Sequence, residues 1–312
     1  MALSAEFPLS SALLERYKII SRRRSRPSLV GGHQMRRKGQ SLEFRDFVPY
    51  AFGDDIRYVD WRMSARYGSE NDLLVRQFAA EEQITLVISI DTRATMELPE
   101  AMPKSLIAMW LAQALAFITL ESDDRIILHR LFGLASDSIA EIKGSKNTAR
   151  IRSAMKRTLK TPDENIINLK ILEQYLPPTA VWLIVTDLYF DSESHQLVRR
   201  IAGARDGLRW IILMDMDSWP HEKFIMGQGA RRIQGPGMDL PNPQFDITPE
   251  SIQLVEKKIE SHKQEIFKRI RPGSFDRIHW KWPITAKPDP VDFFKTAFFE
   301  DNVLQRLFMR QG

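Results

Sequence analysis

Two apolar runs that each end in an aspartate constrain the fold of this chain most strongly. Residues 84–91 read ITLVISID, and residues 181–187 read VWLIVTD. A short apolar run of this kind is typical of a strand that is buried on both faces of a sheet. Further apolar runs and intervening helical patterns lie at 103–120, 125–132, 147–159, 196–202 and 208–214. The alternation predicts an α/β fold with a doubly wound, mostly parallel sheet and helices on both faces.

The flanking segments add further expected elements. The helix expected over 248–270 has the strongest start signal, because Thr248 is a cap residue and Pro249 and Glu250 suit a first turn. The Phe-rich pattern over 291–309 predicts a helical tail. Other expected elements are a helix over 8–20, strands over 138–142 and 277–284, a helix over 169–175 and a hairpin around 224–233.

Charge is unevenly distributed along the chain. The net charge is +5, but residues 1–40 carry nine Lys or Arg and two acids, whereas the other 272 residues carry 36 basic and 38 acidic residues. The basic head could contact nucleic acid or an anionic surface. A protein that binds single-stranded nucleic acid would need aromatic residues among its basic ones. The basic stretch of this head contains none. We therefore favour a partner-facing arm and expect no nucleic-acid partner.

Composition excludes several other classes of protein. The chain has no Cys, which rules out disulfide frameworks, thiolate metal sites and cysteine nucleophiles. Its longest apolar run, Leu106 to Leu120, is shorter than the roughly 20 residues of a membrane span. The N-terminal residues lack the pattern of a secretory signal. We expect a cytoplasmic protein without a membrane span.

Residues 40–80 interleave charged and aromatic side chains at high density. They form either a docking or ligand surface or a network of Arg–carboxylate bonds that fixes a compact subdomain. Asp54, Asp55 and Asp60 could also serve a metal-dependent hydrolase as acid and base. Neighbouring Arg residues, however, would keep these carboxylates ionised. The candidate partner- or ligand-binding residues are Asp54, Asp55, Arg57, Asp60, Trp61 and Arg66 of this block, together with Arg93 further along the chain.

Catalytic motifs are absent from the sequence. It contains no phosphate-binding loop, no dinucleotide fingerprint, no nucleophile elbow and no HExxH, and its six His are scattered. We therefore expect a non-enzymatic protein with no required cofactor. Asp91 and Asp187 each follow a predicted strand, and such strand ends are where α/β sheets bind ligands. Two carboxylates with nearby hydroxyls could hold Mg²⁺.

The strand-end residues resemble those of the von Willebrand factor A fold. That fold carries a D-x-S-x-S loop after its first strand and a later strand-end Asp, which together form a metal-ion-dependent adhesion site. Asp91 and Asp187 match the two aspartates, and Thr95 can stand for the second Ser. Arg93 stands where the first Ser belongs. The resemblance implies a degenerate site, in which Arg93 pairs with Asp91 or Asp187 and occupies the position of the metal.

The block before the first strand resembles a bacterial family called domain of unknown function 58. The matching residues are Glu43, Phe44, Tyr50, Gly53, Asp54, Asp55, Arg57, Asp60, Trp61, Ser64, Ala65, Arg66, Arg76, Phe78 and Glu81. This resemblance implies an adaptor that works with a MoxR-type AAA+ ATPase, and with other von Willebrand factor A-domain proteins, in assembly or maturation of proteins. We expect a basic helix and arm at 1–38, the signature block at 39–82, and the A-like domain with its extension at 83–312.

Overall fold

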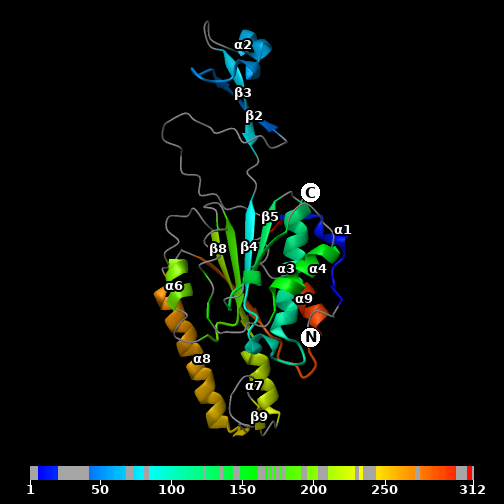
Figure 1. The fold of residues 1–312 in the computed structure, drawn as a ribbon, viewed down its shortest axis with the longest axis vertical. Helices are drawn as coiled ribbons and strands as arrows, with labels where there is room; N and C mark the ends of the chain where they lie inside the picture. Colours follow the sequence, from blue (N-terminus) through cyan, green and yellow to red (C-terminus); the bar gives the residue numbers. More distant parts are fainter. Residues whose placement is uncertain are drawn as a thin grey trace. The chain divides into compact units, whose positions relative to one another are not determined.

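The structure is a computed structural model in which the chain divides into two compact units (Figure 1). One unit comprises residues 1–24 with 84–312, and the other comprises residues 25–83. The expected domain boundaries at 38 and 82 remain predictions. The structure describes residues 6–19, 42–67, 73–80, 84–121, 124–133, 136–142, 148–160, 166–167, 169, 172, 176, 180–190, 195–202, 210–228, 232–234, 244–270, 275–299 and 308–310. The basic stretch and the expected helix over 169–175 lie almost wholly outside the described residues.

A six-stranded sheet forms the centre of the larger unit. Its strand order is β11-β8-β7-β4-β5-β6, and all neighbours are parallel except β6, which runs antiparallel to β5. The strands are β4 (Thr85–Ile90), β5 (Arg125–Arg130), β6 (Ile139–Ile142), β7 (Val181–Thr186), β8 (Trp210–Asp217) and β11 (Asp276–Lys281). The α/β, doubly wound fold is thus confirmed.

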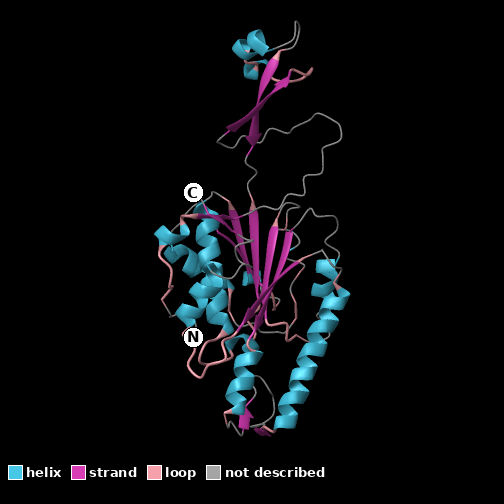
Figure 2. Ribbon diagram, turned by 180° about the vertical axis from the view of Figure 1, so that it is seen from behind, coloured by secondary structure: helices cyan, strands magenta, loops and turns pink. Residues whose placement is uncertain are grey.

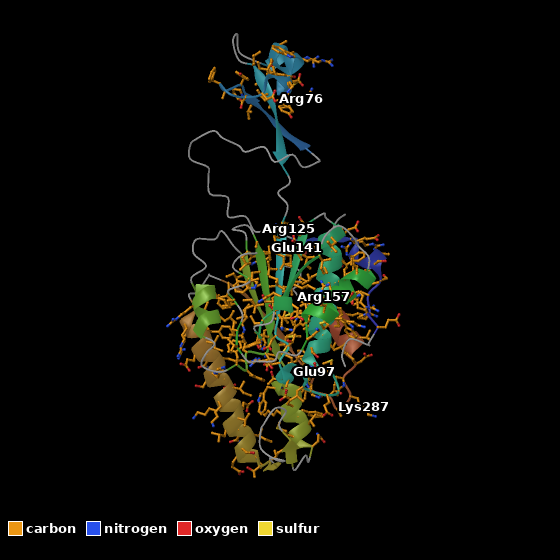
Figure 3. The ribbon with its side chains drawn as sticks, in the orientation of Figure 1. Arg76, Glu97, Arg125, Glu141, Arg157 and Lys287 are labelled. Carbon is orange, nitrogen blue, oxygen red and sulfur yellow. The ribbon has the colours of Figure 1, made fainter. Side chains whose placement is uncertain are left out.

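The centre of the sheet is a topological switch point. The chain passes from β4 to β5 and β6 on one side, and later fills β7, β8 and β11 on the other. In open α/β sheets, ligand sites lie at the carboxyl ends of the strands where the order reverses. At the β6 edge, Arg125 and Glu141 pair across the strands at 2.7 Å and lie side by side in Figure 3.

Helices cover both faces of the sheet (Figures 1 and 2). Because side chains alternate along a strand, Leu86, Ile88 and Ile90 of β4 enter one core and Val87 enters the other. The first core is completed by α1 (Ser11–Leu14), α3 (Lys104–Glu121), α4 (Thr148–Thr158) and α9 (Pro290–Phe299). The second core is completed by α6 (His195–Ala202) and α8 (Pro249–Arg269). The remaining described helical segments of this unit are α7 (Trp219–Gly227), η3 (Ala94–Glu97) and η4 (Ser136–Ser138).

Helix α3 is long and apolar enough to cross a membrane by length and composition alone. Its mean hydropathy over 18 residues is 1.3, yet 89% of this stretch is buried inside the structure. It is the helix that packs on the central strands and contacts α4 and α9. The central helix of a protein core can be as apolar as a membrane span. The hydropathy of α3 is therefore not evidence that it crosses a membrane.

Three expected elements have different boundaries from those predicted. The helix expected over 8–20 is only α1, followed by β1 (Tyr17–Ile19), which pairs with β12 (Phe308–Arg310) near the other end of the chain. The hairpin expected around 224–233 was misplaced: α7 occupies its first part, and the hairpin joins β9 (Arg232–Gln234) to β10 (Gln244–Asp246). The expected tail helix over 291–309 corresponds to α9 up to Phe299, and Phe308–Arg310 form β12 instead of helix.

The smaller unit is built on an antiparallel hairpin. Strand β2 (Leu42–Pro49) pairs with β3 (Leu74–Ala80), with an irregularity between Phe44 and Asp46. Two short helical segments lie between the strands, η2 (Ile56–Tyr58) and α2 (Trp61–Tyr67). Val59 and Val75 form a bridge and are both buried, so the segment between η2 and α2 packs on β3.

Candidate functional site

The two predicted strand-end aspartates meet at the switch point. Asp91 follows β4 and Asp187 follows the neighbouring strand β7, and both side chains are fully buried. The backbone N–H of Asp91 donates to the Val185 carbonyl at 2.9 Å, which extends the ladder by one residue beyond β4. Parallel pairing therefore places both carboxylates at one edge of the sheet, away from water.

Arg93 holds the Asp91 carboxylate from the same loop. Its Nε lies 3.0 Å from Oδ1, its Nη2 lies 2.6 Å from Oδ2, and its backbone N–H donates to Oδ1 at 3.0 Å. The Thr186 hydroxyl donates to Oδ2 at 2.9 Å. Burial raises the pKa of Asp91 above its ordinary value, and the Arg93 guanidinium opposes that rise. Both oxygens accept hydrogen bonds, which is the pattern of an ionised carboxylate.

Lys104 neutralises the second aspartate. It is the first residue of α3, it is 1% exposed, and its Nζ lies 2.9 Å from Asp187 Oδ2. Arg93 Nη2 lies 3.5 Å from Asp187 Oδ1. Burial alone would raise the pKa of Asp187, but the charges of Lys104 and Arg93 hold it below its ordinary value. The cluster therefore joins two carboxylates with two cations and is electrically neutral.

The loop after β7 closes around these charges. Leu188 has a φ of +63°, a left-handed conformation that is uncommon for residues other than glycine. This turn lets the Tyr189 backbone N–H donate to Asp187 at 3.0 Å while the Tyr189 carbonyl accepts from Arg93 at 3.0 Å. The Arg93 guanidinium also lies 4.2 Å from the centre of the Phe132 ring. Uncommon backbone of this kind is often found at functional sites.

A second charged cluster lies at the carboxyl end of strand β8, which neighbours β7. Asp215, in β8, is fully buried between Lys263 of α8 at 2.8 Å and Arg277 of β11 at 2.5 Å. Asp217 accepts from His279 at 3.1 Å. Burial alone would raise the pKa of Asp217, but the bond from His279 and the charge of Lys263 lower it to about 2.

Tyr189 lies between the two clusters. The centre of its ring is 5.1 Å from the Lys104 ammonium and 5.4 Å from the Lys263 ammonium. Burial, followed by the charges of Glu222 and Asp217, raises the pKa of the Tyr189 phenol. In the described part of the chain, its hydroxyl oxygen is buried without a hydrogen-bond partner.

The residues at the switch point do not fit an additional divalent cation. Asp91 and Asp187 are already engaged by the chain's own guanidinium and ammonium groups. Thr95 lies in η3, and its hydroxyl is buried without a hydrogen-bond partner among the described residues. Those residues contain no group of three or more acidic, His or Cys side chains that could hold a metal. Arg93 does pair with both aspartates, as the degenerate motif suggested, but metal binding itself remains a prediction.

The predicted binding residues of the smaller unit are partly used for local structure. Asp54 accepts from the Ala51 backbone N–H at 2.9 Å. Asp55 caps η2 by accepting from the Arg57 backbone N–H at 3.0 Å, and it also binds the Arg57 guanidinium. These bonds favour the compact-subdomain reading for Asp54, Asp55 and Arg57, which was one of the two alternatives.

Asp60 connects α2 to the hairpin. Its carboxylate accepts from the backbone N–H groups of Arg62 and Met63 and from the Arg76 side chain on β3. The bond from Met63, followed by that from Arg76, lowers the pKa of Asp60. The aspartate is thus an ionised cap. By contrast, Trp61 and Arg66 of α2 are exposed.

The reasoning from sequence missed Lys104, Tyr189 and every member of the second cluster. A lysine at the start of an apolar stretch such as α3 is itself a signal for a buried ion pair. Lys263 lies among other basic residues of α8, and Arg277 is the second residue of β11. Neither position signals a partner, because Asp215 lies far away in the sequence and meets them only through tertiary packing.

Comparison with known proteins identifies a family. No curated protein matches the chain. One protein family does match, over residues 46–223. This segment begins in β2, includes η2 and α2, and continues through the central strands into α7. It therefore contains the predicted signature residues from Tyr50 onward and the two strand-end aspartates, whereas Glu43 and Phe44 lie before it. Residues 46–223, more than half of the chain, match the family described as "Protein of unknown function DUF58", and the chain belongs to that family.

Proposed function

We propose that this protein is a non-catalytic adaptor that works with a MoxR-type AAA+ ATPase in chaperone-like assembly or maturation of other proteins. The partner is implied by the resemblance of residues 39–82 to the family signature. Other proteins with von Willebrand factor A domains are further candidate partners, and the cytoplasm is the expected location. The sequence has no phosphate-binding loop of its own, so the energy for such work would come from the ATPase.

One observation carries the proposal: the smaller unit exposes large apolar side chains while its carboxylates hold the local fold. Phe52, Ile56, Trp61 and Tyr67 are all more than half exposed. Large apolar residues gathered on a surface often mark a protein-binding site. Asp55 and Asp60 meanwhile act as caps. These features support protein binding over acid–base catalysis by this block.

The buried cluster at the switch point supports the same reading. Each of its carboxylates has a cation of the chain within hydrogen-bond distance, and none of the four charged groups is more than 9% exposed. A site of this kind stabilises the loops at the sheet edge without offering an open ligand position. It fits a scaffold better than a metal-dependent hydrolase.

The proposal is tested by direct binding of the purified full-length chain to the MoxR-type ATPase from the same organism. Biolayer interferometry would be run without nucleotide, with ADP and with a non-hydrolysable ATP analogue. We expect saturable binding in at least one of these states, because AAA+ ATPases change conformation with nucleotide. Absence of binding in all three states would refute the proposed partnership.

A further inference from the structure

The segment of residues 52–67 presents an unusual set of exposed side chains. Ile56 is 62% exposed, Trp61 is 61% exposed and Tyr67 is 70% exposed, and Phe52 is fully exposed. Aromatic side chains are the commonest anchors of protein interfaces, because they bury a large area with little loss of conformational freedom. We call the exposed residues Phe52, Ile56, Trp61, Arg62, Arg66 and Tyr67 the α2 surface.

The charge of the α2 surface is positive. Helix α2 has the sequence WRMSARY, with two Arg and no acidic residue. Arg62 and Arg66 are both exposed and are spaced four residues apart, so they lie on the same side of the helix. Among the described residues, neither forms an ion pair, whereas Arg57 is paired with Asp55. Two exposed arginines are therefore next in sequence to exposed aromatic residues, Arg62 to Trp61 and Arg66 to Tyr67.

The helix that carries these groups is held in place from beneath. Asp60 caps α2, and its backbone N–H donates to the Leu74 carbonyl at 2.9 Å. The Ser64 hydroxyl donates to the Asp60 carbonyl at 2.7 Å and accepts from the Leu74 backbone N–H at 2.8 Å. Binding to a helix anchored in this way loses less conformational entropy than binding to an unstructured segment.

We propose that the α2 surface binds an acidic protein segment that also contains apolar side chains. This inference adds a binding surface to the proposed function. It rests on that function only in assigning the acidic segment to the ATPase partner. Arg62 and Arg66 would pair with carboxylates, which a guanidinium binds through two parallel hydrogen bonds. Trp61 and Tyr67 would contact the apolar side chains between those acids.

The same surface suits nucleic acid less well. The aliphatic Ile56 offers no ring on which a base could stack. Asp54 is exposed in the same segment, and its negative charge would repel a phosphate backbone, whereas Asp55 is paired with Arg57. An acidic polypeptide experiences the same repulsion, but it can place its apolar side chains beside Asp54. A continuous phosphate chain has no such freedom.

The first experiment measures ATPase binding to full-length variants with matched controls. Arg62→Glu/Arg66→Glu is compared with Arg152→Glu/Lys156→Glu, a pair of exposed basic residues with the same spacing on α4. Trp61→Ala is compared with Ile284→Ala, which is similarly exposed at 66%. Near-ultraviolet circular dichroism confirms that each variant is folded. We expect both α2 variants to weaken binding at least about tenfold and both controls to stay within about twofold.

The second experiment does not depend on the ATPase. A displayed library of random peptides is selected on the unmodified full-length chain, and the selected peptides are tested against Arg62→Glu/Arg66→Glu. We expect enrichment of Asp and Glu together with Leu, Phe or Trp, and loss of binding to the variant. A single-stranded oligouridylate is titrated in parallel. Oligouridylate binding that needs Arg62 and Arg66, without acidic peptides, would overturn the inference in favour of nucleic acid.

The outcomes separate the inference from the proposed function. If the ATPase binds and the α2 variants bind it equally well, the docking surface is refuted while the adaptor function stands. If the ATPase does not bind but acidic peptides are selected and lost on Arg62→Glu/Arg66→Glu, the partnership is refuted while the docking surface stands. Selected peptides without enrichment of acidic residues would overturn the inference in either case.

Discussion

Two Asp-x-Arg pairs in this protein have nearly the same geometry and very different surroundings. In Asp55–Arg57 the backbone N–H of the Arg donates to the carboxylate at 3.0 Å, and Nη2 lies 2.7 Å from Oδ2. In Asp91–Arg93 the corresponding distances are 3.0 Å and 2.6 Å. The side chain of Arg57 is 81% exposed, whereas that of Arg93 is 9% exposed. The same local motif is therefore found once in water and once in the core.

The difference comes from the elements that position each pair. Asp91 follows a central strand that is covered on both faces, so the pair cannot exchange its hydrogen bonds for bonds to water. Asp55 precedes a short 3₁₀ helix in a unit whose described strands form a two-stranded hairpin, which is too small to bury it. Exposed ion pairs contribute little to stability, whereas removal of one partner from a buried pair leaves an uncompensated charge.

The largest effect is expected for Arg93→Met, which leaves Asp91 buried without its guanidinium. We expect the free energy of unfolding to fall by about 3–5 kcal/mol, as measured by urea denaturation of the full-length chain. The variant tests whether burial makes this ion pair contribute more to the free energy of unfolding than the exposed Asp55–Arg57 pair does. A loss below about 1 kcal/mol, as typical of exposed pairs, would break the comparison between the two regions.

A slightly smaller effect is expected for Lys104→Met. Asp187 would lose its closest cation but keep Arg93 at 3.5 Å and the Tyr189 backbone N–H. We expect a loss of about 3 kcal/mol, the lower end of the range for a broken buried pair. The matched control is Lys156→Met, a change at an exposed position of α4. Equal unfolding curves for the two variants would show that the Lys104–Asp187 pair is not part of the stabilising cluster.

A pH-dependent effect is expected from Asp217, whose pKa is lowered to about 2 from an ordinary value of 3.8. A carboxyl group whose pKa is lowered in the folded state stabilises the fold at pH values above its ordinary pKa. This contribution is lost as the pH falls from about 4 to about 2. We expect it to be about 2 kcal/mol. Asp217→Asn should therefore show a weaker loss of stability over this range in denaturation at stepped pH. Parallel pH profiles for the variant and the unmodified chain would contradict the assignment.

The smallest effect is expected for Arg57→Met at the exposed pair. Solvent screens this pair, and Asp55 keeps its cap bond from the residue 57 backbone N–H. The thermal unfolding midpoint should stay within experimental error of the unmodified chain. A midpoint shift comparable to that of Arg93→Met would mean that the smaller unit depends on this pair as strongly as the core depends on the buried one.

The sequence predicted the sheet better than it predicted the partners of the strand ends. The apolar runs at 84–91 and 181–187 were read as buried strands, and parallel pairing then required Asp91 and Asp187 to meet. Arg93 was identifiable because it stands inside the loop motif. Lys104, Lys263 and Arg277 reach the carboxylates only through tertiary packing, and no local pattern encodes which buried aspartate each one meets.

The segments near the two ends of the chain show where local sequence patterns predict the wrong secondary structure. Residues 8–20 have helical periodicity, but Tyr17–Ile19 form a strand because they pair with Phe308–Arg310. Neither segment alone encodes this pairing. In the signature block, the density of Asp and Arg pointed to either a network or a surface. In the structure, the carboxylates of Asp55 and Asp60 accept local backbone hydrogen bonds, and Trp61 is exposed.

We propose that Arg93, which pairs with both Asp91 and Asp187, occupies the position that a metal ion would take between them. Isothermal calorimetry with MgCl₂ tests it most directly, on the unmodified chain, on Arg93→Ser and on the exposed-pair control Arg57→Ser. Near-ultraviolet circular dichroism first confirms that each variant is folded. We expect Arg93→Ser alone to raise Mg²⁺ affinity, by at least about tenfold. Equal affinity in the unmodified chain and in folded Arg93→Ser would contradict it.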